Sequence, residues 1–183
     1  MLKQHPFGWI TPRARPWLLL ILLILTVILS QVLGRLGEPL KTSAAPAGIV
    51  SFELARTVTA TEQVLTSWPS GAWENAFLLQ GLDFLYLFVY PLWFSLSAVL
   101  LGARLPAGWQ RAANLVAWVV LLTGPLDAIE NIALIQELLH GPATNLAQLA
   151  WLCASLKFGL LGVAALFLLV GLVVWGGRRL LSR

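Results

Sequence analysis

The chain has 183 residues, of which 58% are hydrophobic and 11% are charged, and its formal net charge is +4. Soluble domains carry about 25% charged residues, so this composition excludes an ordinary water-soluble protein. It predicts an all-α polytopic membrane protein that forms a single membrane domain over residues 1–183, with four transmembrane helices in a bundle.

The first apolar run covers about residues 17–33 and predicts the first transmembrane helix. A cleaved signal peptide is the alternative, because Lys3, Arg13 and Arg15 precede the run and Val32-Leu33-Gly34 resembles a cleavage site. We favour the transmembrane helix, since the apolar part of a signal peptide usually has only about 7 to 15 residues.

A long loop follows the first span. Residues 40–48 are rich in Ala, Ser, Thr and Pro, which is typical of a linker. Ser51 is then a candidate N-cap for an amphipathic helix over about residues 51–68, which we expect on the outer membrane surface as a connector or as a lid. The apolar face of this helix comprises Leu54, Val58, Thr61, Leu65 and Trp68. The side chains expected to point elsewhere are those of Glu53, Arg56 and Gln63.

Three further apolar runs, at about residues 76–101, 112–138 and 149–175, predict the remaining spans. In the third of them, Pro125 lacks a backbone N–H and, beside Gly124, predicts a kink. Basic side chains at both ends of the chain and in the loop between the second and third spans predict cytoplasmic termini. These residues are Lys3, Arg13, Arg15, Arg104, Arg111, Arg178, Arg179 and Arg183. Topology and anionic lipid explain this basic excess, so we expect no nucleic-acid partner.

Ionisable side chains interrupt the last three spans. Each costs roughly 2.5 to 3.5 kcal/mol at the bilayer centre unless it is paired or functional. At about 1.5 Å per residue from the outer ends of the spans, Asp83, Asp127, Glu130 and Lys157 lie at similar depths of roughly 10 to 16 Å. Asn131 shares a helix face with Asp127 and Glu130. The sequence therefore predicts one polar cluster in the outer half of the membrane.

The candidate site residues for ligand binding or proton relay are Asp83, Asp127, Glu130, Asn131, Lys157, Tyr86 and Tyr90. The two tyrosines follow Asp83 at helical spacing. Within the spans, three acids face one lysine, and this excess of acid has three possible explanations. One carboxyl stays protonated, Arg56 reaches in from the loop, or a bound cation or amine completes the balance.

Motifs for other chemistry do not occur in the sequence. His5 and His140 lie in the N-terminal tail and in a short loop, so we expect no metal and no cofactor. The sequence lacks Ser-x-x-Lys, Gly-x-Ser-x-Gly and a phosphate-binding glycine loop. No residue is assigned a catalytic role. The single cysteine, Cys153, excludes an intrachain disulfide.

The run Asp127-Ala128-Ile129-Glu130-Asn131, with Lys157-Phe158 in the last span, resembles a group of uncharacterised bacterial four-helix membrane proteins. The resemblance covers about residues 50–170 and implies a bacterial cytoplasmic membrane but no function. Asp83 followed by Pro91 is also similar to the second helix of the sterol isomerase and sigma-2 receptor type of fold. The chain departs from that fold's pattern at Gln31, where an acid would be expected, and in its third-helix acids and Lys157.

Three functions from different classes fit these residues. In the first, the cluster binds a lipidic or amine-bearing small molecule or relays protons. In the second, the protein is an accessory or assembly subunit of a membrane complex, and the cluster is a structural clasp. The aromatic side chains expected to meet the partner are Phe84, Phe88, Trp93 and Phe94.

The third is a membrane-embedded, isomerase-like enzyme on an apolar substrate, with Asp127 or Glu130 as acid and base and Lys157 as electrostatic partner. We favour the first function, because a clasp needs only one ion pair and this chain has an excess of acid. The expected partners are membrane lipids, a lipidic small molecule and a membrane protein. Whether the protein is an enzyme stays open.

Overall fold

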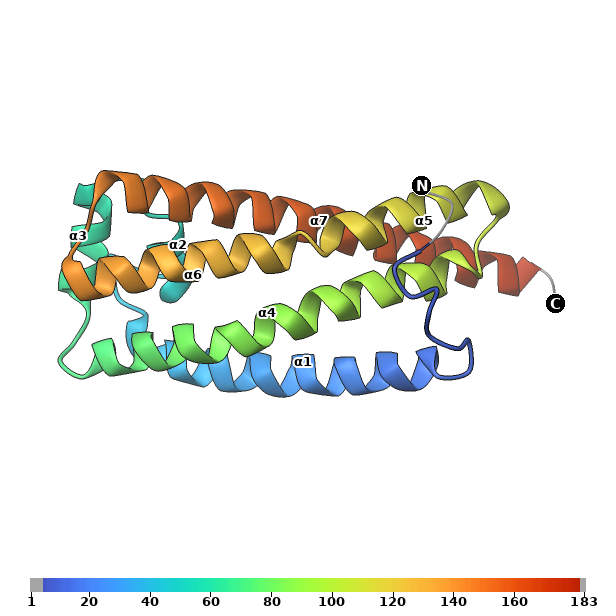
Figure 1. Ribbon diagram of the computed structural model, residues 1–183, viewed down its shortest axis with the longest axis horizontal. Helices are drawn as coiled ribbons and strands as arrows, with labels where there is room; N and C mark the ends of the chain where they lie inside the picture. Colours follow the sequence, from blue (N-terminus) through green and yellow to red (C-terminus); the bar gives the residue numbers. More distant parts are fainter. Residues whose placement is uncertain (1–4, 182–183) are drawn as a thin grey trace. The chain divides into compact units, whose positions relative to one another are not determined.

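The computed structural model describes residues 5–181 (Figure 1), so Lys3 and Arg183 lie outside the described residues. The chain is 80% helical, and no strand occurs between residues 5 and 181. Four helical stretches are long and apolar enough to cross a membrane, and short helices lie between the first two. The prediction of an all-α fold with four candidate membrane spans is confirmed.

The helical elements appear in Figure 1 in this order: α1 (Arg15–Gly37), the short 3₁₀ turn η1 (Glu38–Leu40), α2 (Ile49–Glu53), α3 (Val58–Ser67), α4 (Ala72–Gly102), α5 (Ala107–Val120), α6 (Thr123–His140) and α7 (Thr144–Leu181). The candidate spans are Arg15–Leu40, Ala72–Gly102, Ala107–His140 and Thr144–Leu180. Each contains one of the predicted apolar runs and extends beyond it. Helical hydrogen bonds continue past the point where the side chains become polar, so hydropathy marks only the central part of each helix.

Contacts within the described chain form two compact units. Unit 1 contains residues 5–26, 89–123 and 158–181, and unit 2 contains residues 27–88 and 124–157. The helices α1, α4 and α7 therefore contribute residues to both units, whereas α2 and α3 belong to unit 2 and α5 to unit 1.

The segment between α1 and α4 differs from the prediction of one amphipathic helix over residues 51–68. It forms two short helices, α2 and α3, and the N-cap of α3 is Thr57 rather than Ser51. Thr57 has an extended backbone, and its Oγ1 accepts a hydrogen bond from the Ala60 N–H at 3.2 Å, the usual geometry of an N-cap. Ser51 lies inside α2, and its Oγ accepts a hydrogen bond from the Ala47 N–H at 3.0 Å.

The break between α2 and α3 changes which side chains are buried. Thr61 and Trp68 of the predicted apolar face are buried, but Leu54, in the break, is 42% exposed. Glu53, which was predicted to point elsewhere, is buried at 8% exposure. Both errors have one cause. The predicted face assumed a regular rotation of about 100° per residue over residues 51–68, and the turn between α2 and α3 interrupts that rotation.

The hydrophobic core of unit 2 holds α2 and α3 against α4 and α6. Phe52 of α2 packs edge-on against Trp68, with ring centroids 5.6 Å apart. Both belong to a buried cluster that also contains Leu65, Leu79 and Leu134. Complete burial of one such side chain contributes about 1.5 to 3 kcal/mol. The residue next to Phe52 is Glu53, so this packing also fixes the position of the Glu53 carboxyl group.

The predicted kink near Pro125 is present as a complete interruption between α5 and α6, at residues 121–122. Pro125 lies in the first turn of α6, where its missing N–H would have no helical partner in any case. Across the interruption, Thr123 Oγ1 at the start of α6 donates a hydrogen bond to the carbonyl oxygen of Val120, the last residue of α5, at 2.7 Å.

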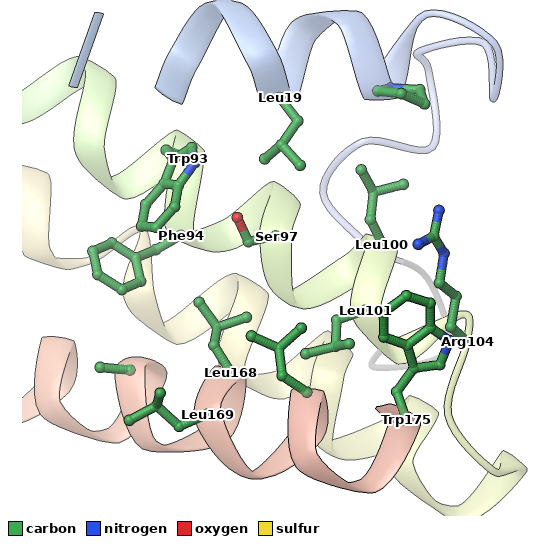
Figure 2. Close-up of a pocket in the computed structure, with 13 residues that line it drawn as sticks. Leu19, Trp93, Phe94, Ser97, Leu100, Leu101, Arg104, Leu168, Leu169 and Trp175 are labelled. Carbon is green, nitrogen blue, oxygen red and sulfur yellow. The ribbon is translucent and has the colours of Figure 1, made fainter. Parts of the chain in front are cut away.

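Two glycines of unit 1, Gly102 and Gly171, lie at close contacts with neighbouring side chains. A Cβ atom on Gly102 would overlap the Cβ of Ala113, and one on Gly171 would lie 2.7 Å from Leu101 Cδ2. Small residues at such contacts allow helices to pack tightly in a membrane. Residues of α1, α4 and α7 within this unit also line a groove (Figure 2).

Candidate functional site

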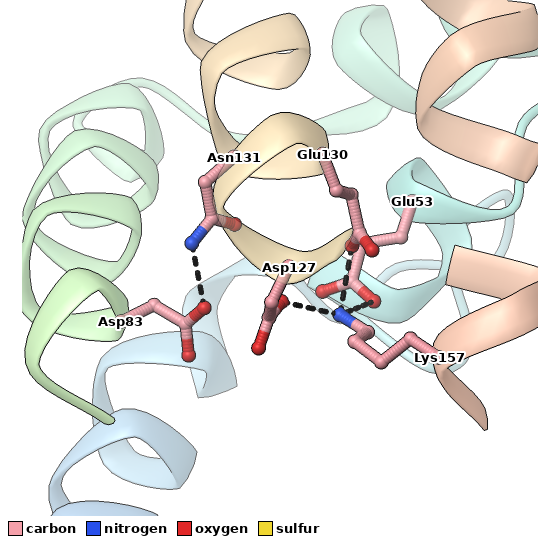
Figure 3. A network of polar contacts seen from close by, with 6 residues as sticks. All are labelled: Glu53, Asp83, Asp127, Glu130, Asn131 and Lys157. Atoms are coloured by element: carbon pink, nitrogen blue, oxygen red, sulfur yellow. Dashed lines mark hydrogen bonds and ion pairs between the residues drawn. The ribbon is translucent and has the colours of Figure 1, made fainter. Parts of the chain in front are cut away.

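Lys157 of α7 is buried among acidic side chains in unit 2 (Figure 3). Its Nζ donates hydrogen bonds to Asp127 Oδ1 at 2.7 Å and to Glu130 Oε1 at 2.9 Å. A third carboxyl oxygen, Glu53 Oε2, lies 3.6 Å from the same Nζ. A lysine ammonium has three N–H donors, so the three carboxyl groups match its donor capacity. We call this group of four side chains the Lys157 cluster.

Two elements besides α7 supply these acids. Asp127 and Glu130 are three residues apart on α6, so one helix face presents both to Lys157. Glu53 is the last residue of α2 and approaches from the segment between α1 and α4. The exposed fractions of Asp127, Glu130 and Lys157 are 2%, 0% and 6%. These three side chains are therefore almost completely buried within the protein.

A second polar contact begins at the next residue of α6. Asn131 Nδ2 donates a hydrogen bond to Asp83 Oδ2 of α4 at 2.7 Å (Figure 3). Thus α6 faces Lys157 through Asp127 and Glu130, and faces α4 through Asn131. The structure brings together five of the seven predicted site residues: Asp83, Asp127, Glu130, Asn131 and Lys157.

The two tyrosines have other positions. Tyr86 OH shares a hydrogen bond of 2.9 Å with Ser30 Oγ of α1, one helical turn after Asp83. Tyr90 is buried within unit 1 and so does not belong to the unit that holds Lys157. The hydrogen bond of Tyr86 connects α4 to α1.

Arg56 does not supply a second cation to the Lys157 cluster. It is exposed, and its guanidinium stacks over the Trp151 ring with its central carbon 4.5 Å from the ring centroid. One of the three explanations for the acidic excess is thereby removed. The excess itself is larger than the spans alone predicted, because Glu53 adds a fourth carboxyl group to those of Asp83, Asp127 and Glu130.

Glu53 is the site residue that sequence reasoning missed. A signal was present, because Glu53 lies four residues after Ile49 and next to Phe52, on the apolar face of a short helix that ends there. That signal disappears when residues 51–68 are treated as one helix, because the phase of the longer apolar pattern then places Glu53 on the polar side.

Electrostatics make full ionisation of these acids costly. Four carboxylates around one ammonium would carry a net charge of −3, and like charges in a low-dielectric interior repel strongly. Burial raises the pKa of Glu53, which lies outside the candidate spans; attraction to Lys157 opposes this effect, and repulsion from Asp127 adds to it. The buried oxygens Glu53 Oε2 and Glu130 Oε2 accept no hydrogen bond of normal geometry from the described residues.

A metal ion has no prepared site within the described residues, since no group of three or more His, Cys, Asp or Glu side chains there is arranged to bind one. In the Lys157 cluster, the ammonium group itself lies where the carboxyl oxygens converge. The position that a cation would occupy is therefore filled by the chain.

The four candidate spans and the Lys157 cluster together indicate a helical integral membrane protein with a buried lysine that is ion-paired to three acidic residues. No protein-family model, no curated protein and no solved structure matches the chain. The motif resemblance described above stays a prediction, and a function must be argued from the geometry of the site.

Proposed function

We propose that the Lys157 cluster is a proton-binding site within the membrane and that the protein takes up and releases protons there. The observation that carries this proposal is the buried excess of acid: Glu53, Asp127 and Glu130 share one lysine, with Asp83 close by. At least one carboxyl group then holds a proton, because two or more uncompensated negative charges in a dry interior would be too costly.

Glu53 and Glu130 are the pair best suited to share such a proton. Glu130 accepts a hydrogen bond from Lys157 Nζ at Oε1, and its second buried oxygen, Oε2, accepts none of normal geometry. Glu53 Oε2 lies 3.6 Å from the same Nζ and also accepts no hydrogen bond of normal geometry. A proton on one carboxyl can be donated to the other, which satisfies both oxygens and removes one negative charge. The raised pKa of Glu53 agrees with this arrangement.

Access for protons fits the position of Glu53. It belongs to the segment between α1 and α4, outside the candidate spans, whereas Asp127, Glu130 and Lys157 lie within them. Protons would enter through Glu53 and reach Asp127 by way of Glu130 and Lys157. With cytoplasmic termini, as the basic residues predict, this entry would face the outside of the bacterial cytoplasmic membrane.

Binding of an amine-bearing ligand has less support from the geometry. Such a ligand needs a carboxylate that is free to pair with it, and the amine of Lys157 already contacts three of the four acids. Proton exchange fits the site better, because Lys157 already occupies the position of a cation and the remaining carboxyl groups can still bind protons.

Infrared spectroscopy of the protein in liposomes tests the proposal, because the carbonyl stretch of a protonated carboxyl group is separate from the bands of an ionised one. We expect a protonated-carboxyl band at neutral pH in the parent protein and its loss or reduction in Glu130→Gln. The matched control is Glu62→Gln, because Glu62 is an exposed acid of α3. Absence of the band from the parent at pH 7 would contradict the proposal.

Proton uptake is measured separately in liposomes that contain a pH-sensitive dye. Under an imposed pH gradient, the parent should dissipate the gradient faster than empty liposomes, and Glu130→Gln should match empty liposomes. Glu62→Gln should behave as the parent does. Equal rates for the parent and for empty liposomes would mean that the cluster binds protons without moving them.

A structural clasp in an accessory subunit is the second candidate function. The observation in its favour is that Lys157 of α7 has carboxyl partners on two other helices, since it donates hydrogen bonds to Asp127 and Glu130 of α6 and lies 3.6 Å from Glu53 Oε2 of α2. If this function is correct, Glu130→Gln will destabilise the fold without changing either the infrared band or the rate of proton uptake.

A further inference from the structure

Acidic and basic residues are distributed unequally between the two units. The three segments of unit 1 contain no Asp or Glu, whereas eight of the twelve basic residues fall within the sequence ranges of this unit. All eight acidic residues fall within unit 2. Among the described residues, Arg104 of this unit forms no ion pair with an Asp or Glu side chain.

An apolar groove of about 600 Å³ lies in the same unit (Figure 2). Side chains of α1, α4 and α7 line it, among them Leu19, Trp93, Phe94, Leu168 and Leu172. Figure 2 shows Trp93 and Phe94 at one end and Arg104 and Trp175 at the other. The groove thus has an apolar length and a cationic end.

A second arginine, Arg179, does not line the groove but lies over Trp175, which does. The guanidinium carbons of Arg104 and Arg179 lie 5.4 Å and 4.6 Å from the centroid of the Trp175 ring. Both distances share one centroid, so the two carbons are at most about 10 Å apart, within one Debye length at 0.1 M salt. Two cations close to one aromatic ring repel each other, and an anion that contacts both would offset this repulsion.

We propose that this groove binds an anionic phospholipid, with one acyl chain along the leucine and aromatic side chains and the headgroup phosphate at Arg104 and Arg179. The volume lies within the range of about 300 to 1,000 Å³ that is usual for small-molecule sites. Arginine suits this role, because its planar guanidinium donates two parallel hydrogen bonds to a phosphate. Every residue involved belongs to unit 1, so the proposal does not depend on the proton-binding function of the Lys157 cluster.

A lipid chain fits the groove better than a helix of another protein. From Trp93 to Leu101 the groove follows α4 for about 12 Å at 1.5 Å per residue, and a helix is about 10 Å across, so a partner helix would enter the groove only in part. An extended acyl chain is much narrower. The adjoining Arg104 also gives the site an electrostatic preference that a purely apolar helix contact would not need.

Native mass spectrometry of the detergent-purified protein tests the proposal with two lipids that have the same acyl chains, phosphatidylglycerol and phosphatidylcholine. The parent should bind phosphatidylglycerol about tenfold more tightly than phosphatidylcholine, because the positive choline group of the second lipid would lie close to the two arginines and be repelled by them. Arg104→Gln should bring the two affinities together. Arg111→Gln is the matched control, because Arg111 is an exposed arginine of unit 1 that does not line the groove, and it should retain the preference.

Variants that fill the groove test the acyl-chain contact separately. Ser97→Phe and Leu169→Trp each place bulk in the lining, and Leu169 is 64% exposed, so a tryptophan there does not disturb the packing of the unit. Both should weaken the binding of both lipids about tenfold, which is the effect of removing about two acyl-chain carbons from contact with the groove. Retention of full binding in both variants would overturn the proposal.

Two further outcomes would identify a different occupant. Displacement of phosphatidylglycerol by millimolar inorganic phosphate would mean that the arginines bind a free anion without the acyl chain. A mass equal to two protein molecules for the parent, reduced to one molecule in Leu169→Trp, would mean that a second copy of the protein covers the groove. Equal binding of the two lipids by the parent would also contradict the proposal.

Discussion

Lys157 Nζ lies 2.7 Å from Asp127 Oδ1, and the side chains of these residues are 7% and 3% exposed. Lys41 and Glu38 form an ion pair of nearly the same length, 2.8 Å, but their side chains are 50% and 64% exposed. The protein therefore contains a buried and an exposed lysine–acid pair of equal geometry. The two lysines differ in burial and in the number of nearby carboxyl groups, which is three for Lys157 and one for Lys41.

Replacement of Lys157 by methionine should lower the free energy of unfolding by about 3 to 5 kcal/mol, because the buried acids lose their cation. Lys41→Met removes the exposed pair and should cost less than about 1 kcal/mol. Thermal unfolding in detergent measures both. A loss for Lys157→Met no larger than that for Lys41→Met would show that the buried acids are not held as charges by the lysine.

The raised pKa of Glu53 predicts a pH dependence of stability. A carboxyl group whose pKa is higher in the folded than in the unfolded protein binds its proton more tightly in the folded state. Its contribution is complete below the ordinary value of 4.5 and is lost as the pH rises through the raised value. The parent should thus lose stability above about pH 4.5, and Glu53→Gln should lose less.

Unfolding transitions of parent and variant, recorded between about pH 4 and 9, measure this difference. Glu62→Gln serves as the control, since Glu62 is exposed on the neighbouring helix α3. Parallel stability curves for the parent and Glu53→Gln would contradict a raised pKa at this position.

Thr61 predicts a stabilising substitution. Its side chain is fully buried, and its Oγ1 makes no hydrogen bond with the described residues. A buried hydroxyl group without a partner costs about 1 to 3 kcal/mol, and valine has nearly the same shape without that cost. Thr61→Val should therefore raise the free energy of unfolding by about 1 kcal/mol. Thr59→Val, at an exposed position of the same helix, should change stability by no more than about 0.5 kcal/mol in either direction.

Gly102 predicts a destabilising substitution in unit 1. Alanine there would place its Cβ on the Cβ of Ala113, and neither atom can rotate away, so Gly102→Ala should cost about 1 to 3 kcal/mol. The same replacement at Gly108, where a Cβ would meet nothing within 4 Å, should cause no loss. Ala113→Gly in the Gly102→Ala background should restore part of the stability. Failure of this rescue would place the cost elsewhere.

Much of the site could be predicted from the sequence because lipid simplifies the problem. A charged residue inside an apolar span must find a partner, and depth along a straight helix follows from residue number. This reasoning found Asp127, Glu130 and Lys157, and it found Asp83 with Asn131. It also identified the region of the break near Pro125, since proline has a known effect on a helix.

The part that could not be predicted lies in the segment between α1 and α4. Thr57 rather than Ser51 caps α3, although serine is by type the somewhat better N-cap. The choice depends on the packing of Phe52 and Trp68, which is tertiary information. Glu53 was missed for the same reason. Tyr90 was expected in the cluster because it shares a helix face with Asp83 and Tyr86. Helical spacing does not show that this face passes from unit 2 into unit 1 before Tyr90.

The ion pairs between α6 and Lys157 have a consequence for synthesis of the chain. Asp127 and Glu130 leave the ribosome before Lys157, so α6 would enter the bilayer with two acids and no counter-ion. Only residues 141–143 separate α6 from α7. We therefore expect these two helices to insert together as a hairpin, and removal of the Lys157 charge to leave α6 outside the membrane in a fraction of the molecules.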